Sequence, residues 1–116
     1  MAEKHHKITY IELPAIDLTA TKTFYNQVFA WEFTDWGSEY ISFAGAGVDG
    51  GFRIDDEVTP TTPGPLVVLY SSDLETTEQA IVAAGCSICV PIFAFPGGRR
   101  FHFKDPNGNE LAVWSE

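Results

Sequence analysis

The sequence predicts an α+β fold made of two copies of a βαβββ unit, and two observations support this prediction. The segment Asp17–Thr21 (DLTAT) is echoed in the second half by Asp73–Thr77 (DLETT), and an apolar run precedes each of them. After each segment the apolar residues recur first every four positions and then every two, as in a helix followed by strands. Neither half is large enough to close a hydrophobic core alone.

The first helix is predicted to begin at the first of these segments. Ala20, Phe24 and Val28 recur every four residues and form one apolar face. Asp17 or Thr19 can cap its N-terminus, because short polar side chains accept hydrogen bonds from the first free backbone N–H groups.

The second helix carries its own start and stop residues. Ser72 and Glu75 have the spacing of a capping box, with Asp73 as a competing cap, and Gly85 is a natural stop. Around the two helices, alternating apolar residues predict eight short strands. These strands are expected at residues 8–13, 31–34, 40–44, 48–54, 66–70, 86–95, 99–104 and 110–114.

The composition fits one domain over residues 1–116. The chain is 45% hydrophobic and 14% aromatic, which is enough to bury a core without disulfide or metal staples. We expect a first unit at 7–54, a polar linker with three prolines at 55–65 and a second unit at 66–116.

The charge excludes several classes of function. Sixteen acidic and seven basic residues give a net charge of −9, and nucleic acids and anionic membranes both require basic patches.

No apolar stretch approaches the roughly 20 residues of a transmembrane helix, and the N-terminus lacks the apolar segment of a secretory signal. Two cysteines do not make a disulfide framework. We therefore expect a cytoplasmic protein.

Two motifs resemble the vicinal oxygen chelate superfamily, which contains glyoxalase I, bleomycin-resistance proteins and extradiol dioxygenases. The first is Asp17-Leu18 followed by Phe24-Tyr25 and by 28–31 (VFAW), in which Ala30 replaces the usual glycine. The second is 103–109 (FKDPNGN), close to the family's Phe-x-Asp-Pro-Asp/Asn-Gly-Asn pattern. The resemblance covers residues 8–115 and implies that both units form an open eight-stranded cup.

The resemblance also implies positions for metal ligands, and this chain does not fill them. The expected positions hold Tyr10, Leu66 and Ala112, and the fourth position, near 51–54, has no His, Glu or Gln. Leucine and alanine have no donor atom for a divalent metal. We therefore expect no metal, no cofactor and none of the family's usual metal-dependent activity.

Strand alternation predicts which side chains line the cup instead. Most are aromatic or aliphatic with a few polar groups, which suits a small, flat organic ligand. The predicted ligand-binding residues are Tyr10, Glu12, Phe52, Leu66, Tyr70, Arg100, His102 and Trp114.

Glu12 and His102 are weak candidates for catalysis, since an inward carboxylate beside an inward imidazole can transfer protons. The alternative is a solvated rim pair, or a salt bridge to Arg100. A replacement metal site from Glu12, His102 and Glu110 is a further, less favoured possibility.

Two other motifs are interpreted as structural. Cys86 and Cys89 form a C-x-x-C motif after the predicted helix stop rather than at a helix N-terminus, so no redox role is expected. The glycines of 45–50 fit G-x-G-x-x-G, but no helical pattern follows them, so we expect a hairpin.

The function favoured by the sequence is metal-independent binding of a small apolar or aromatic molecule, as in bleomycin-resistance proteins. The alternative is a glyoxalase-, isomerase- or dioxygenase-like enzyme with a noncanonical site that uses Glu12, Tyr70 and His102. A third possibility is a non-catalytic regulatory module. The edge strands of an open cup and the resemblance both favour a homodimer.

Overall fold

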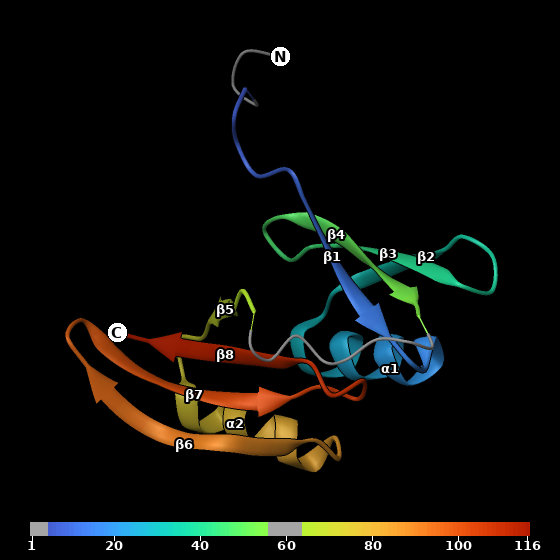
Figure 1. Cartoon of the computed structure of the whole chain (residues 1–116). Coiled ribbons are helices and arrows are strands. Elements are labelled where there is room, and N and C mark those ends of the chain that lie inside the picture. Colours follow the sequence, from blue (N-terminus) through green and yellow to red (C-terminus); the bar gives the residue numbers. More distant parts are fainter. Residues whose placement is uncertain (1–4, 56–63) are drawn as a thin grey trace. The chain divides into compact units, whose positions relative to one another are not determined.

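The computed structural model describes residues 5–55 and 64–116 (Figure 1). The chain divides into two compact units, residues 1–58 and 59–116, and each is described by itself. Most of the predicted linker at 55–65 lies outside the described residues. Among the described residues, no helix is both long and apolar enough to cross a membrane.

The first unit has the predicted βαβββ order. Its elements are β1 (Tyr10–Ala15), α1 (Leu18–Phe29), β2 (Glu32–Asp35), β3 (Tyr40–Ala44) and β4 (Asp49–Ile54). The strands form one sheet in the order β1-β4-β3-β2, in which β1 and β4 are parallel and the other pairs antiparallel.

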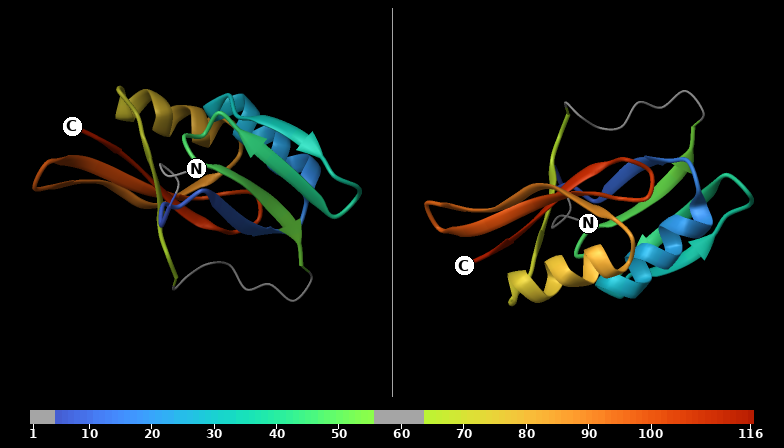
Figure 2. Two further views of the ribbon diagram at one scale, coloured as in Figure 1. Left: turned by 90° about the horizontal axis from the view of Figure 1, so that it is seen from above. Right: turned by 90° about the horizontal axis from the view of Figure 1, so that it is seen from below.

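The second unit repeats this topology. It contains β5 (Val67–Tyr70), α2 (Leu74–Ala83), β6 (Ser87–Phe95), β7 (Gly98–Lys104) and β8 (Glu110–Ser115). The sheet order is β5-β8-β7-β6, with β5 and β8 parallel, and β6 and β7 form a long hairpin (Figure 2). The predicted α+β fold with two βαβββ modules is confirmed.

An aspartate caps each helix. Asp17 accepts a hydrogen bond from the backbone N–H of Ala20 (3.0 Å), and Asp73 accepts one from that of Thr76 (3.2 Å). The sequence left Ser72 and Asp73 as alternative caps of α2, and Asp73 takes the N-cap position. The Asp73 carboxylate directly precedes the helix and accepts from these N–H groups as well as a serine hydroxyl does.

The first unit buries an aromatic core between α1 and its sheet. Tyr25 stacks on Trp31 (ring centroids 4.6 Å apart), and Trp31 stacks on Phe43 (4.6 Å). Phe52 is fully buried in this core, 5.2 Å from Tyr25, so its predicted place on the cup wall was wrong. The strand register explains the error: Phe52 lies opposite Leu13, and residues paired across strands share a face of the sheet.

The core of the second unit is aliphatic and aromatic. Alternate residues of β7 and β8 are fully buried, together with residues of α2 that the sheet covers. This core contains Leu74, Ile81, Phe101, Phe103, Leu111 and Val113.

The turn between β7 and β8 is built around a buried carboxylate. Asp105 is 4% exposed and accepts hydrogen bonds from the backbone N–H groups of Asn107 (2.8 Å) and Asn109 (2.9 Å). Gly108 adopts a φ of +88°, a conformation that favours glycine. The Asp-Pro-Asn-Gly-Asn motif is therefore a structural turn.

Candidate functional site

The candidate site lies on the open face of the second unit, which we define as the face of its sheet opposite α2. Leu111 and Val113 of β8 are buried in the core, so the residues that alternate with them point to the other face. The register of β5, β7 and β6 then assigns further side chains to the same face. The side chains of the open face include Val68, Tyr70, Val90, Phe93, Phe95, Arg100, His102, Lys104, Glu110, Ala112 and Trp114.

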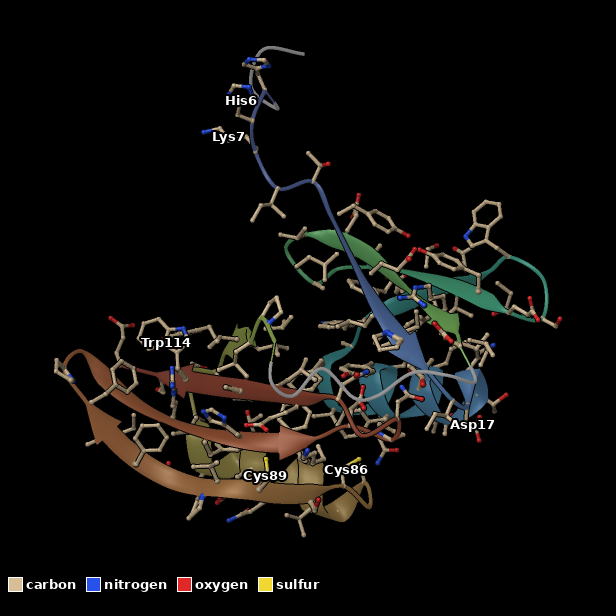
Figure 3. All side chains as sticks on the ribbon, viewed as in Figure 1. His6, Lys7, Asp17, Cys86, Cys89 and Trp114 are labelled. Atoms are coloured by element: carbon tan, nitrogen blue, oxygen red, sulfur yellow. The ribbon has the colours of Figure 1, made fainter. Side chains whose placement is uncertain are left out.

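Aromatic rings form a row across one end of this face. The Tyr70 and Trp114 rings meet edge to face with centroids 5.1 Å apart, and Phe95 lies 6.4 Å from Trp114. Figure 3 shows Trp114 near the end of β8, beside the β6–β7 hairpin. Edge-to-face contacts at these distances stabilise the row and leave ring faces available for stacking.

Arg100 lies over Phe95 of this row and over one further ring, Phe93. Its guanidinium carbon is 5.3 Å from the ring centroid of Phe93 and 5.8 Å from that of Phe95. Such cation–π contacts hold the side chain against the sheet. The Nε atom of Arg100 is buried and has no hydrogen-bond partner among the described residues.

His102 is the buried polar residue of the face. The residue is 9% exposed, and its Nδ1 lies 2.8 Å from Oε2 of Glu110. A carboxylate can only accept, so in the neutral ring Nδ1 carries the proton and Nε2 presents a lone pair. Nε2 is also buried, and within the described part of the chain nothing hydrogen bonds to it.

The open face of the first unit, opposite α1, is polar. Arg53 bridges Glu12 (3.0 Å) and Asp55 (2.7 Å), and the hydroxyl groups of Tyr10 and Tyr40 are hydrogen bonded. Burial, followed by the hydrogen bonds to Tyr10 and Glu12, raises the pKa of Tyr40 well above its usual range. The polar groups on this face thus satisfy one another.

A hollow of about 360 Å³ adjoins this polar network. Its lining includes the side chains of Tyr10 and Ser42 and two carboxylates, Glu32 and Asp49. The lining contains no basic side chain, so an anionic ligand is not favoured here.

The structure brings together four of the predicted ligand-binding residues. Tyr70, Arg100, His102 and Trp114 share the open face of the second unit, and the exposed Leu66 directly precedes β5. Glu12 belongs to the first unit and His102 to the second, so their pairing stays a prediction. Each has its own partner within its unit, Arg53 for Glu12 and Glu110 for His102.

The sequence analysis did not identify Phe93 and Phe95 as site residues. The register of β6 shifts between Ile88 and Val90 and again between Val90 and Phe93. Simple alternation fails across such irregularities, because each one changes the face to which the following side chains point. The only available signal was the aromatic content of the strand itself.

The residues at the implied metal positions do not fit a metal site. The Tyr10 hydroxyl is bonded to Tyr40, and Ala112 lies fully buried between Val68 and His102 in the register. Three or four N, O or S donors are needed for a tightly bound transition metal. In the residues that the structure describes, no three His, Cys, Asp or Glu side chains gather where they could hold one.

Cys86 directly precedes β6, and Cys89 lies within that strand (Figure 3). Both are free thiols, and burial raises the pKa of Cys86 to about 11 and also raises that of Cys89. A redox-active or metal-binding thiol has a lowered pKa. The shifts therefore agree with the structural interpretation of this motif.

Comparisons with solved structures agree with this architecture. A glyoxalase-related enzyme from Fulvimarina pelagi is 23% identical (TM-score 0.78), with 96% of this chain and 88% of that one covered. The fosfomycin resistance protein FosX from Listeria monocytogenes is 20% identical (TM-score 0.79; 93% and 91% covered). Lactoylglutathione lyase from Agrobacterium tumefaciens is also 20% identical (TM-score 0.71; 93% and 92% covered). At these identities the likeness shows the fold alone.

A comparison with curated proteins gave no match. A family model, in contrast, matches residues 7–113, which include both βαβββ units and both motifs described above. The chain therefore belongs to the Glyoxalase/Bleomycin resistance protein/Dioxygenase superfamily.

Proposed function

We propose that this protein binds a small, flat aromatic molecule, without a metal ion, on the open face of its second unit. The observation that carries the proposal is the set of aromatic rings on that face. The Trp114 ring lies 5.1 Å from that of Tyr70 and 6.4 Å from that of Phe95, and Arg100 lies over the rings of Phe93 and Phe95.

Exposure of apolar side chains on this face supports the proposal. Tyr70 is 53% exposed, Val68 43% and Phe93 37%. Exposed apolar side chains gathered on one face of a small protein are typical of interaction sites, and an aromatic ligand that covers part of them removes apolar surface from water. The few polar groups among them are suited to orienting the ligand.

Equilibrium dialysis against 2-methoxynaphthalene, a flat aromatic probe without charge, tests the proposal. We expect saturable binding that Phe93→Ala and Trp114→Ala each weaken about tenfold, since stacking on one aromatic side chain contributes roughly 1–3 kcal/mol. Trp36→Ala is the matched control, because Trp36 is 64% exposed and belongs to the first unit. Absence of saturable binding, or equal losses in all three variants, contradicts the proposal.

An enzyme is a second candidate, because one feature of the face favours it. The carboxylate of Glu110 orients the imidazole of His102 so that Nε2 is free to accept a proton, which is the arrangement of a general base. An enzyme converts a bound aromatic molecule into a product that chromatography detects, and His102→Leu abolishes the conversion. A simple binding protein returns the ligand unchanged.

As partner we propose a second copy of the chain. Strand β5 lies at the edge of its sheet, and Leu66 and Val68 are exposed beside it. Exposed edge strands with apolar side chains favour association with another chain. Light scattering after gel filtration tests this: we expect twice the chain mass, and the mass of a single chain overturns the dimer.

A further inference from the structure

We infer that the aromatic ligand carries a hydroxyl group, which donates a hydrogen bond to Nε2 of His102. This inference rests on the proposed function, since it specifies the ligand of the same open face. It comes from two buried polar atoms, His102 Nε2 and Arg100 Nε, that have no hydrogen-bond partner among residues 5–55 and 64–116.

The first of these atoms is an acceptor. Glu110 fixes the proton of the neutral His102 ring on Nδ1, so the lone pair on Nε2 faces away from the carboxylate. A buried polar atom without a hydrogen-bond partner destabilises the structure, because its interaction with water has been lost without replacement. A donor on the ligand removes this cost and therefore gains affinity.

The second atom is a donor on the same strand. Arg100 and His102 are two residues apart on β7, so both side chains point to the open face. Phe93 lies next to both of them: its ring centroid is 5.3 Å from the guanidinium carbon and 6.1 Å from the imidazole centroid. An aromatic ligand that covers Phe93 thus meets an acceptor and a donor together.

A hydroxyl group matches this pair better than other common substituents. Its hydrogen can be donated to His102, and its oxygen can accept from Arg100 Nε–H or from a water held there. A carboxylate has no hydrogen to donate to Nε2, and an ammonium group meets the positive charge of Arg100. The chemical class is therefore a hydroxylated aromatic, such as a phenol or naphthol.

The experiment compares 2-naphthol with its methyl ether, 2-methoxynaphthalene, by equilibrium dialysis at neutral pH. The two probes share their flat rings, and only the naphthol has a hydrogen to donate. We expect the naphthol to bind about tenfold more tightly than the ether, which corresponds to about 1.4 kcal/mol. In His102→Leu the two probes should bind equally, with the affinity for the ether retained.

Two further variants keep the test informative. In the first unit, Ser42 of β3 occupies the register position that His102 occupies in the second unit. Ser42→Ala should leave the preference for naphthol over its ether unchanged. His102→Gln keeps a hydrogen-bond acceptor at the site and should retain part of the preference for naphthol. It takes the place of His102→Leu if that variant fails to fold.

The outcomes separate the inference from the proposed function. Equal binding of naphthol and ether to the unaltered protein overturns the inference and leaves the aromatic site in place. Tighter binding of the ether or of 2-naphthoate than of 2-naphthol likewise overturns the inference. If neither probe binds to the unaltered protein, the proposed function itself is overturned.

Discussion

The two units share one topology, yet their open faces differ in chemistry. In the first unit, Arg53 lies between two carboxylates and the tyrosine hydroxyls bond to each other. In the second unit, Arg100 lies over aromatic rings, and its Nε and the Nε2 of His102 have no partner among the described residues. One face satisfies its polar groups internally, and the other leaves these two buried atoms without a partner in the described part of the chain.

The strand registers allow the faces to be compared position by position. Glu12 of β1 and Val68 of β5 occupy equivalent places, each beside the central strand. On that strand Arg53 corresponds to Trp114. Where the first unit has a charge network, the second unit has apolar and aromatic side chains at the equivalent positions, so the same topology carries two chemically different faces.

The largest expected difference concerns the turns that lead into the last strand of each unit. Asp105→Ala removes a buried acceptor of two backbone hydrogen bonds, and we expect the free energy of unfolding to fall by about 2–4 kcal/mol. The first unit's turn relies on Gly47 at φ +92° with open space around it. Gly47→Ala should therefore cost only about 1 kcal/mol, the strain of a left-handed alanine.

Denaturant unfolding of both variants measures this difference. If Asp105→Ala costs no more than Gly47→Ala, the carboxylate does not organise the turn. The control is an unchanged slope of the unfolding free energy against denaturant concentration, since a changed slope indicates an altered denatured state.

The next prediction concerns the central strands. Gly51 and Ala112 occupy the same register position, but a Cβ at Gly51 collides with the hydroxyl of Tyr40 and lies 2.8 Å from the carbonyl oxygen of Ile41. We expect Gly51→Ala to lower the free energy of unfolding by about 1–3 kcal/mol, as overpacking does. Binding of 2-naphthol, measured on the folded fraction, should not change.

A loss of naphthol binding in folded Gly51→Ala contradicts the assignment of the ligand to the second unit. An unchanged stability shows instead that Tyr40 moves aside without cost. Ala112→Gly is the matched variant, and there only the ordinary cost of glycine in a strand, about 1 kcal/mol, is expected.

Comparison of the units also shows which features of the structure can be predicted from the sequence. Apolar periodicity, the two Asp-Leu motifs and the turn residues were sufficient for the fold, because each reports local backbone preference or a single buried face. Alternation also placed Tyr70, Arg100, His102 and Trp114 correctly on one face, since β5, β7 and β8 are regular.

The errors occurred where pairing between strands decides the outcome. Phe52 was assigned to the wrong face because its register with Leu13 is a long-range property. Phe93 was missed because β6 contains register shifts. The partner of His102 depends on which residue of β8 lies nearby, and Glu110 is brought there only by the hairpin.

A smaller effect is expected at the ends of the two helices. Ala30 follows α1 with φ +61°, whereas the chain leaves α2 through Gly85 with φ +92°. Glycine adopts this conformation without the steric penalty of a Cβ. We expect Ala30→Gly to stabilise the protein by about 0.5–1 kcal/mol and Gly85→Ala to destabilise it by about 1 kcal/mol. Thermal unfolding checks both signs, and a destabilised Ala30→Gly contradicts the capping argument.

The smallest effect on stability is expected at Arg53, and it brings the comparison back to the open faces. Arg53 and its partners Glu12 and Asp55 are more than one-third exposed, so water and salt screen their attraction. Arg53→Gln should leave both the unfolding midpoint and the affinity for 2-naphthol nearly unchanged. Arg100→Gln should lower that affinity about fivefold, because the buried Nε–H and the cation over Phe93 are lost together. Equal effects of the two substitutions on naphthol binding mean that Arg100 contributes only net charge, since that is the one property the two arginines share.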